Sequence, residues 1–327
     1  MPFATPLARL AAACTLALGA VAPALAADAF PSRPITVVIP FPPGGATDVL
    51  GRVIGQKLGD TLGQTVVVEN RAGAGTIIGA SYVAKAAPDG YTVLVSSGTT
   101  FTVNPAIRNN LPYDPVKSFD PIGIAGRTGL ILLANKDVPV QTVKQFVDYV
   151  KASPDKYAYG SFGSGTTAQF AGEIVLSATG LKMTHVPYKG SAPAMTDLMG
   201  GQIPFTVDTV SAAIPQLKSG KIKAIAVTTA KRSALLPDVP TMAENGYPDI
   251  NMDTWLVLAA PKGLPADVKA KLEKALATVM ADADTRSKLT AQGFEPAYAN
   301  AAAASDLINK ELPVMRALAQ RANITAD

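Results

Sequence analysis

The chain has 327 residues, of which 48% are hydrophobic and 17% are charged. This composition excludes a disordered protein, which needs few hydrophobic residues and much charge, and the length indicates two domains. One histidine and one cysteine cannot form a His/Cys zinc cluster or a disulfide framework, and a net charge of +4, spread evenly, argues against a nucleic-acid-binding protein.

The N-terminal segment has the pattern of a secretory signal peptide. Arg9 precedes an apolar run over residues 11–25, which ends in the small-residue site Ala24-Leu25-Ala26. An uncleaved membrane anchor is the weaker alternative, because the run is shorter than the roughly 20 apolar residues that span a bilayer. We therefore predict a signal peptide over residues 1–26, cleaved after about Ala26, and an exported protein with no later membrane-spanning segment.

Residues 33–96 alternate between strand and helix patterns. An almost continuous apolar run at 33–40 is typical of a parallel strand that is buried on both faces. We predict further strands at 65–69 and 91–96, a helix that starts at a Thr47 N-cap, and a helix at 77–86. A β-α-β-α-β order of this kind indicates a parallel sheet with right-handed crossovers.

A second alternating series begins near residue 128, and the C-terminal part is helical. The predicted strands lie at 129–134, 157–161, 182–187, 203–208 and 223–228, with helices at 143–152, 167–179, 192–199 and 212–219. A strand at 255–259 and helices at 265–283 and 302–321 follow, and we expect them to return to the first lobe. The predicted division is residues 27–127 with 253–327 in lobe 1 and 128–252 in lobe 2, with crossovers near 125–129 and 229–256.

A proline- and glycine-rich turn joins the first predicted strand to its helix. Gly44 and Gly45 immediately precede the predicted cap Thr47, and Asp48 suits the positive end of the helix dipole. Such a turn is explained by chain reversal and capping alone, but two glycines also let a ligand approach the free amides of a helix start, which bind anions. No Walker-type lysine follows, so a nucleotide phosphate is not indicated.

A second glycine turn, Gly163-x-Gly165-x-x-Ala168, opens the helix predicted at 167–179. A dinucleotide-binding fingerprint would need an acidic residue about twenty positions later, and residues 182–189 contain none. We therefore interpret this turn as a set of backbone N–H groups, with the hydroxyls of Ser164, Thr166 and Thr167 beside them.

Three isolated residues have both a structural and a functional interpretation. His185 stands in a predicted strand, and no Gly-x-Ser-x-Gly turn presents a serine to it, so a structural role is favoured over catalysis. Asp208 ends a predicted strand, where open parallel sheets bind ligands, but it is an equally good cap for the next helix. Trp255 is the only tryptophan, and packing is favoured over stacking on a ligand.

Several motifs together resemble one family. They are PFPPGGATD (40–48), VENRAGAG (68–75), APDGY (87–91), LPYDP (111–115), HVPYKG (185–190) and DLMGGQ (197–202). The chain resembles the Bug (Bordetella uptake gene) receptors, the extracytoplasmic receptors of tripartite tricarboxylate transporters. This resemblance implies a two-lobed, type II-like Venus flytrap in which each lobe is a mostly parallel sheet flanked by helices. It also implies a monomeric periplasmic receptor that delivers a small organic carboxylate to an integral-membrane permease.

The resemblance further implies which residues bind the ligand. The set comprises Pro43, Gly44, Gly45, Ala46, Thr47, Ser97, Gly98 and Thr99 from lobe 1, with Ser164, Gly165, Thr166, Tyr188 and Asp208 from lobe 2. We expect no catalysis, no cofactor, no metal and no nucleic acid. A sensor that docks on a membrane signalling protein and a secreted hydrolase or isomerase that uses Asp208 or His185 remain as alternatives. Di- and tricarboxylates and aromatic carboxylates fit the pattern equally.

Overall fold

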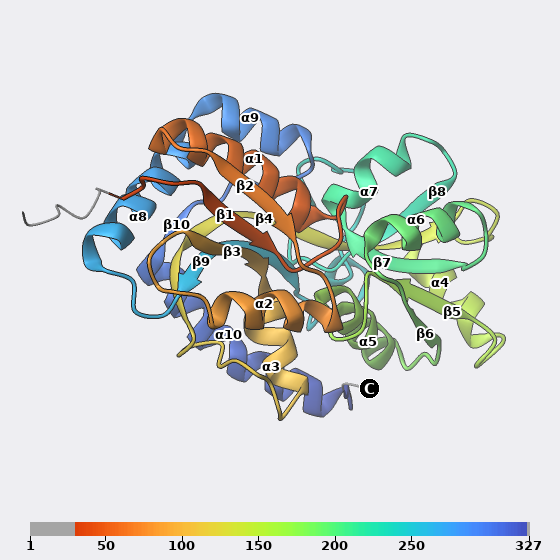
Figure 1. Cartoon of the computed structure of the whole chain (residues 1–327). Helices are drawn as coiled ribbons and strands as arrows, with labels where there is room; N and C mark the ends of the chain where they lie inside the picture. Colours follow the sequence, from red (N-terminus) through yellow and green to blue (C-terminus); the bar gives the residue numbers. More distant parts are fainter. Residues whose placement is uncertain (1–29, 326–327) are drawn as a thin grey trace, which may run out of the picture.

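The computed structural model describes residues 30–325 (Figure 1). The predicted signal peptide, residues 1–26, lies outside this range. Within it, none of the helices combines the length and the apolar character that a membrane crossing requires.

The first sheet is built from the first three strands, which run parallel. β1 (Ile35–Ile39) lies between β2 (Val66–Asn70) and β3 (Thr92–Ser97). Val37, Val38 and Ile39 are fully buried, because helices cover both faces of β1 and the apolar run has no solvent side. The helices α1 (Ala46–Leu62) and α2 (Ile77–Ala84) connect these strands.

The chain returns to this sheet near its C-terminal end. β9 (Asp253–Pro261) pairs antiparallel with both β3 and β4 (Phe119–Asn135), and β10 (Ala299–Asn300) also pairs with β4. The helices α8 (Ala266–Ala281) and α9 (Ala283–Ala291) pack on α1, and α10 (Ala301–Arg321) packs on β4. The sequence indicated one helix at 265–283, whereas the structure has a second helix after Asp282.

The second sheet shares β4 with the first. β4 pairs antiparallel with β7 (Phe205–Thr209) and β8 (Ile222–Val227), while β5 (Ala158–Ser161) pairs parallel with β7 and β6 (Thr184–Pro187). The helices of this part are α4 (Val143–Lys151), α5 (Thr167–Thr179), α6 (Ser191–Met199) and α7 (Val210–Leu217).

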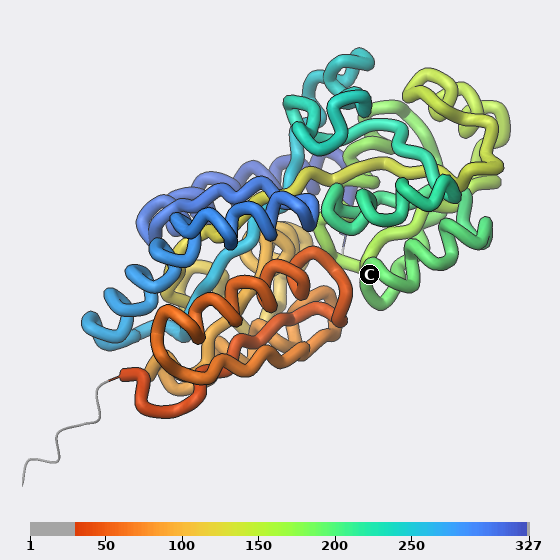
Figure 2. Tube along the Cα trace, turned by 90° about the horizontal axis from the view of Figure 1, so that it is seen from above, coloured from red at the N-terminus to blue at the C-terminus, as the bar shows by residue number. Residues whose placement is uncertain are grey.

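We call the two parts lobe 1, built on β1–β3, β9 and β10, and lobe 2, built on β5–β8. β4 changes partners between Gly129, which pairs with Asp253 of lobe 1, and Leu130, which pairs with Thr209 of lobe 2. Figures 1 and 2 show the two lobes side by side with this strand running through both. The predicted α/β class is confirmed. The exact division of the chain at residues 128 and 252 stays a prediction.

Candidate functional site

The turn after β1 brings the start of α1 to the boundary between the lobes. Gly44 has a φ of +88°, which a glycine adopts without strain, and Gly45 is the N-cap. The prediction of Thr47 as the cap is wrong, because Thr47 is already inside α1. Since glycine has no side chain, no side-chain hydrogen bond caps the first amides of α1.

Asp48 stabilises this turn from behind. Its carboxylate accepts hydrogen bonds from the Gly44 N–H at 2.9 Å, the Asn70 amide at 2.8 Å and the Arg52 guanidinium at 3.0 Å. Burial alone would raise the pKa of Asp48, but these hydrogen bonds, that of Arg52 foremost, hold the pKa below its usual value. Asp48 is therefore charged, and its hydrogen bonds hold the loop in place.

Three helices of lobe 2 also begin at the boundary between the lobes. The N-cap of α5 is Thr166, whose hydroxyl donates to the Gly163 carbonyl and caps no amide. The N-cap of α6 is Gly190, with a φ of +106° and no side chain. Only α7 is capped by its own residue, Thr209, which accepts from the Ala212 N–H. Together with α1, the starts of four helices meet between the lobes, and in three of them the N-cap side chain accepts no hydrogen bond from a helix amide.

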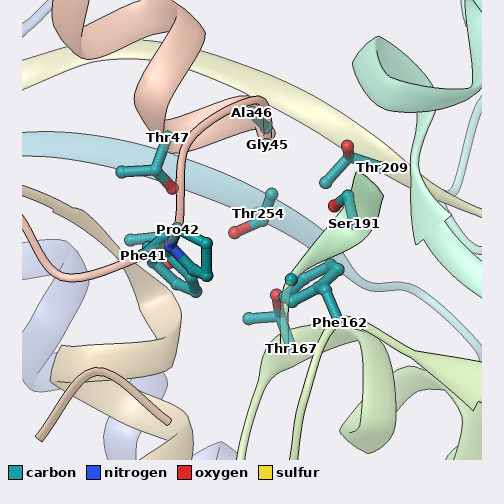
Figure 3. Close-up of a pocket in the computed structure, with 12 residues that line it drawn as sticks. Phe41, Pro42, Gly45, Ala46, Thr47, Phe162, Thr167, Ser191, Thr209 and Thr254 are labelled. Carbon is teal, nitrogen blue, oxygen red and sulfur yellow. The ribbon is translucent and has the colours of Figure 1, made fainter. Parts of the chain in front are cut away.

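These helix starts surround a small cavity, which we call the inner cavity; together with the solvent-open space at its mouth it holds about 370 Å³ (Figure 3). Residues of both lobes line it, and none of them has a charged side chain: Phe41, Pro42, Gly45, Ala46, Thr47, Ser97, Phe162, Thr167, Gly190, Ser191, Thr209 and Thr254. Any charge that the cavity accepts must therefore be balanced by backbone N–H groups, helix dipoles and hydroxyls, which together favour an anion.

The walls of the inner cavity contain polar atoms without partners. Among the described residues, five buried side-chain polar atoms have no hydrogen bond, and two of these, the hydroxyls of Thr167 and Thr254, belong to residues of the lining. Buried polar atoms nearly always have a hydrogen-bond partner, so atoms without one in a cavity wall indicate that a ligand or a water molecule hydrogen-bonds to them.

Asp208 lies directly behind the inner cavity. It is fully buried, and its Oδ1 accepts from the Ser191 hydroxyl at 3.0 Å and from the Thr209 N–H at 2.7 Å, while its Oδ2 has no partner. Burial raises the pKa of Asp208 to about 7, and the hydrogen bonds from Thr209 and Ser191 offset this only in part. Asp208 thus orients two residues of the lining without lining the cavity itself.

The predicted ligand-binding residues fall into three groups. Gly45, Ala46, Thr47 and Ser97 line the inner cavity, and Ser164, Thr166 and Tyr188 line a larger groove outside it. The remainder line neither: Pro43, Gly44, Gly98, Thr99, Gly165 and Asp208. Thr99 instead connects the lobes, because its hydroxyl accepts the Thr167 N–H at 3.1 Å.

Sequence reasoning missed several residues of the lining, namely Phe41, Phe162, Gly190, Ser191, Thr209 and Thr254. Three of them stand directly after predicted strands, as do the glycine turns that were noticed. The rule that ligands bind beyond the carboxyl ends of strands could have found Phe41, Phe162 and Thr209. Thr254 opens β9, and no local pattern distinguishes it.

The outer groove, with its solvent-open space, holds about 1,210 Å³ and adjoins the inner cavity, with which it shares Phe41, Pro42, Phe162 and Gly190. The Phe41 ring of lobe 1 meets the Phe162 ring of lobe 2 edge to face, with 6.2 Å between the ring centres. This aromatic pair therefore stands between the two spaces and joins the lobes at the boundary.

Three other residues singled out by the sequence lie apart from the inner cavity. The Nε2 atom of His185 is 2.7 Å from the hydroxyl of Ser161, which is fully buried and also bonded to the Gly163 N–H. The Tyr188 hydroxyl donates to Asp197 at 2.8 Å, and burial together with that carboxylate raises its pKa to about 12. Trp255 is buried in the lobe 1 core, where its indole N–H donates to Glu311.

Comparison with known proteins adds evidence independent of this geometry. Residues 50–324 match the model of the tripartite tricarboxylate transporter family receptor. Protein BugT of Bordetella pertussis is 35% identical over 285 residues, which cover 87% of each chain. The solved structure of R. palustris Rpa4515 with adipate has a TM-score of 0.88 and 34% identity, and covers 90% of this chain and 99% of that one. MatC of Rhodopseudomonas palustris with bound malate has a TM-score of 0.83 and 32% identity, and covers 88% and 99%.

Proposed function

Because this chain belongs to the receptor family of tripartite tricarboxylate transporters, whose members are periplasmic solute-binding proteins, we propose that it captures a small organic carboxylate between its two lobes and delivers it to a membrane permease. The resemblance noted in the sequence motifs is thereby confirmed. An N-terminal signal peptide, a monomeric state and the permease as partner are parts of this proposal.

The observation that supports it is a cavity without cations at the meeting point of four helix starts. A carboxylate placed there would accept hydrogen bonds from the uncapped amides of α1, α5 and α6 and from the hydroxyls of Thr167 and Thr254. Hydrogen bonds to a charged group contribute roughly 1.5–3 kcal/mol each, so a few of them supply the about 8 kcal/mol that a micromolar dissociation constant requires.

The ligands of two structural neighbours support the same class of solute. Rpa4515 was solved with adipate and MatC with malate, and both ligands are carboxylates. The proposed binding residues in this chain are the lining of the inner cavity, with Asp208 and Thr99 in support.

We also propose that the bound acid leaves unchanged. A hydrolase built on His185 would need an accessible nucleophile, whereas the hydroxyl beside His185 belongs to the buried Ser161. Asp208 likewise has no exposed surface from which to reach a substrate.

A thermal-shift screen tests this function. The protein is unfolded and refolded to remove bound solute, and is then heated with acetate, succinate, adipate, malate, citrate, benzoate or nicotinate at about 1 mM. For a dissociation constant near 1 μM, binding adds roughly 4 kcal/mol to the free energy of unfolding, which raises the melting temperature by several degrees. We expect such a rise for at least one acid, with the acid recovered intact by NMR. No shift with any acid, or conversion of the acid, would contradict the proposal.

A further inference from the structure

The outer groove differs from the inner cavity in its charge. Its lining includes two cationic residues, Arg108 and Lys189, and no acidic residue, whereas the inner cavity has no charged side chain at all. The two spaces share four lining residues, the Phe41–Phe162 pair among them, so a ligand that occupied both would place one end in the groove that these cations line.

Arg108 is the better placed of the two cations. It follows α3 (Asn104–Ile107) in lobe 1 and is half-buried, whereas Lys189 is exposed. Its Nε donates to the Asn104 side chain at 3.0 Å, and a Cβ at Gly165 of lobe 2 would lie 3.3 Å from its Nη2. The guanidinium is therefore held at the boundary between the lobes.

Within the described residues, Arg108 forms no ion pair, although most of the arginines there do: Arg33, Arg52, Arg71, Arg127 and Arg232 each contact a carboxylate. Arginine presents its donors as a planar fork that matches a carboxylate, so an oriented, half-buried and unpaired guanidinium in a groove is suited to receive one from a ligand.

We propose that the outer groove is a second anion subsite, in which Arg108 binds the distal anionic group of a ligand whose first carboxylate occupies the inner cavity. This inference rests on the proposed function and adds a residue that sets selectivity. The inner cavity then selects for one carboxylate, and Arg108 selects for a second anionic group at the far end of the molecule.

A calorimetric titration with matched pairs of acids tests the subsite. The stripped protein is titrated with succinate, glutarate, adipate and suberate, and with butyrate, pentanoate, hexanoate and octanoate, which have the same carbon chains with one carboxylate. We expect at least one diacid to bind about tenfold or more tightly than its monoacid. In Arg108→Gln that diacid should lose about tenfold in affinity while its monoacid is unaffected, because only the diacid reaches the guanidinium.

Two further variants separate a direct contact from a general charge effect. Arg316→Gln removes an exposed charge from a neighbouring surface depression that Arg108 also borders, but Arg316 does not line the outer groove, so both affinities should stay as in the wild type. Arg108→Lys keeps the charge without the fork and should retain part of the preference.

The outcomes distinguish this inference from the function on which it rests. If Arg108→Gln weakens diacid and monoacid equally, Arg108 serves only to hold the lobes together and the subsite is refuted. Equal affinities of the wild type for the two members of every pair would also refute the subsite, but would leave the carboxylate receptor intact. If the wild type binds no acid of either series, the proposed function fails and the subsite with it.

Discussion

Gly45 shows how one residue without a side chain creates the proposed site. As the N-cap of α1 it offers no side-chain acceptor to the first amides of the helix, and a Cβ at this position would lie 3.6 Å from the Ser191 hydroxyl of lobe 2. Its φ of −87° is one that any residue adopts, so the backbone does not require glycine here; glycine instead leaves the neighbouring amides uncovered by a side chain.

We expect Gly45→Val to weaken carboxylate binding by about ten- to a hundredfold, because its methyl groups would cover amides that donate to the ligand at roughly 1.5–3 kcal/mol each. Calorimetry measures the affinity, and circular dichroism checks that the variant is folded. Gly45→Ala is the graded control. Its Cβ would lie at an ordinary contact distance of 3.6 Å from the Ser191 hydroxyl, so this variant should lose less affinity than Gly45→Val. A folded Gly45→Val protein with unchanged affinity would remove this loop from the site.

Asp208 makes the stability of the protein depend on pH. Its pKa is about 7 when folded, and the ordinary value for the unfolded chain is 3.8. Between these values the folded protein keeps a proton that the unfolded chain has lost, so the free energy of unfolding falls as pH rises. The contribution of Asp208 is therefore complete below about pH 4 and is lost as pH rises through about 7.

Asp208→Asn removes this titration. We expect its free energy of unfolding, relative to the wild type, to improve by a few kcal/mol between about pH 4 and about pH 8. Urea unfolding at several pH values measures the difference. A difference between Asp208→Asn and wild type that is the same at every pH would show that folding leaves the pKa of Asp208 unchanged.

Among the helices, α10 connects the two lobes. Its Ala304 and Ile308 pack in the core of lobe 1, whereas Met315 and Ala319 pack in the core of lobe 2, with Pro313 between the two pairs. Prolines inside helices interrupt the hydrogen-bond ladder and are common bending points. The crossing of α10 from one lobe to the other thus coincides with a place where the helix is weakened.

Glu311 fixes α10 at this crossing. Its carboxylate accepts from the Trp255 indole and from the Thr102 hydroxyl, both at 2.7 Å. Thr102 belongs to the π-helical turn η3 (Thr99–Val103), which follows the cavity-lining strand β3. Burial raises the pKa of Glu311, and the bonds from Thr102 and Trp255 counteract part of this rise. One side chain therefore links α10, β9 and the segment that follows Ser97.

We expect Glu311→Ala to reduce the free energy of unfolding by about 1–3 kcal/mol, because it leaves the buried indole N–H of Trp255 without its acceptor, while the Thr102 hydroxyl keeps the Gly98 carbonyl at 3.0 Å. Trp255 is the only tryptophan, so its fluorescence reports this site alone, and we expect its emission to shift to the red. Glu311→Gln retains an acceptor oxygen, so its free energy of unfolding should fall by less than that of Glu311→Ala. Equal denaturation midpoints for Glu311→Ala and the wild type would show that the Glu311 hydrogen bonds add nothing to the stability of the fold.

Regular elements could be predicted from local sequence patterns, and irregular ones could not. The continuous apolar run of β1 and the periodicity of α5 predicted both elements within two residues. The first half of β4 was missed because Pro121, Gly123 and Gly126 read as a loop, although pairing with β9 keeps this segment extended. The turn η3 and α9 were missed because neither has a strong amphipathic pattern.

The same division applies to the candidate site. Glycine turns at helix starts are visible in the sequence, and they indicated Gly45, Ala46 and Thr47, which line the inner cavity. Ser191 and Thr254 come from different lobes and reach the cavity only when the lobes meet. No local sequence pattern indicates which residues of the two lobes come together. The shape of the cavity, which determines which acid fits, could therefore not be predicted from the sequence.

On the scale of the whole molecule, the lobes meet on both sides of the proposed site. Thr99 bonds to Thr167, Phe41 packs on Phe162, and a Cβ at Gly75 would lie against the Ser164 carbonyl. The links between the lobes are β4, the chain before β9 and α10 (Figure 2). Under the proposed function, hinge motion at these links would open the lobes to admit a solute and close them around it.

The most direct test of this account is a crystal structure of the protein with the acid that binds most tightly. We predict that one carboxylate lies in the inner cavity, where it accepts hydrogen bonds from backbone N–H groups at the start of α1 and at the start of at least one helix of lobe 2. The Thr167 or Thr254 hydroxyl should also lie within hydrogen-bond distance of this carboxylate. No cationic side chain should contact it. An acid bound outside the inner cavity, or one whose inner carboxylate is held by a lysine or arginine, would contradict the central claim that helix starts and hydroxyls alone recognise the anion.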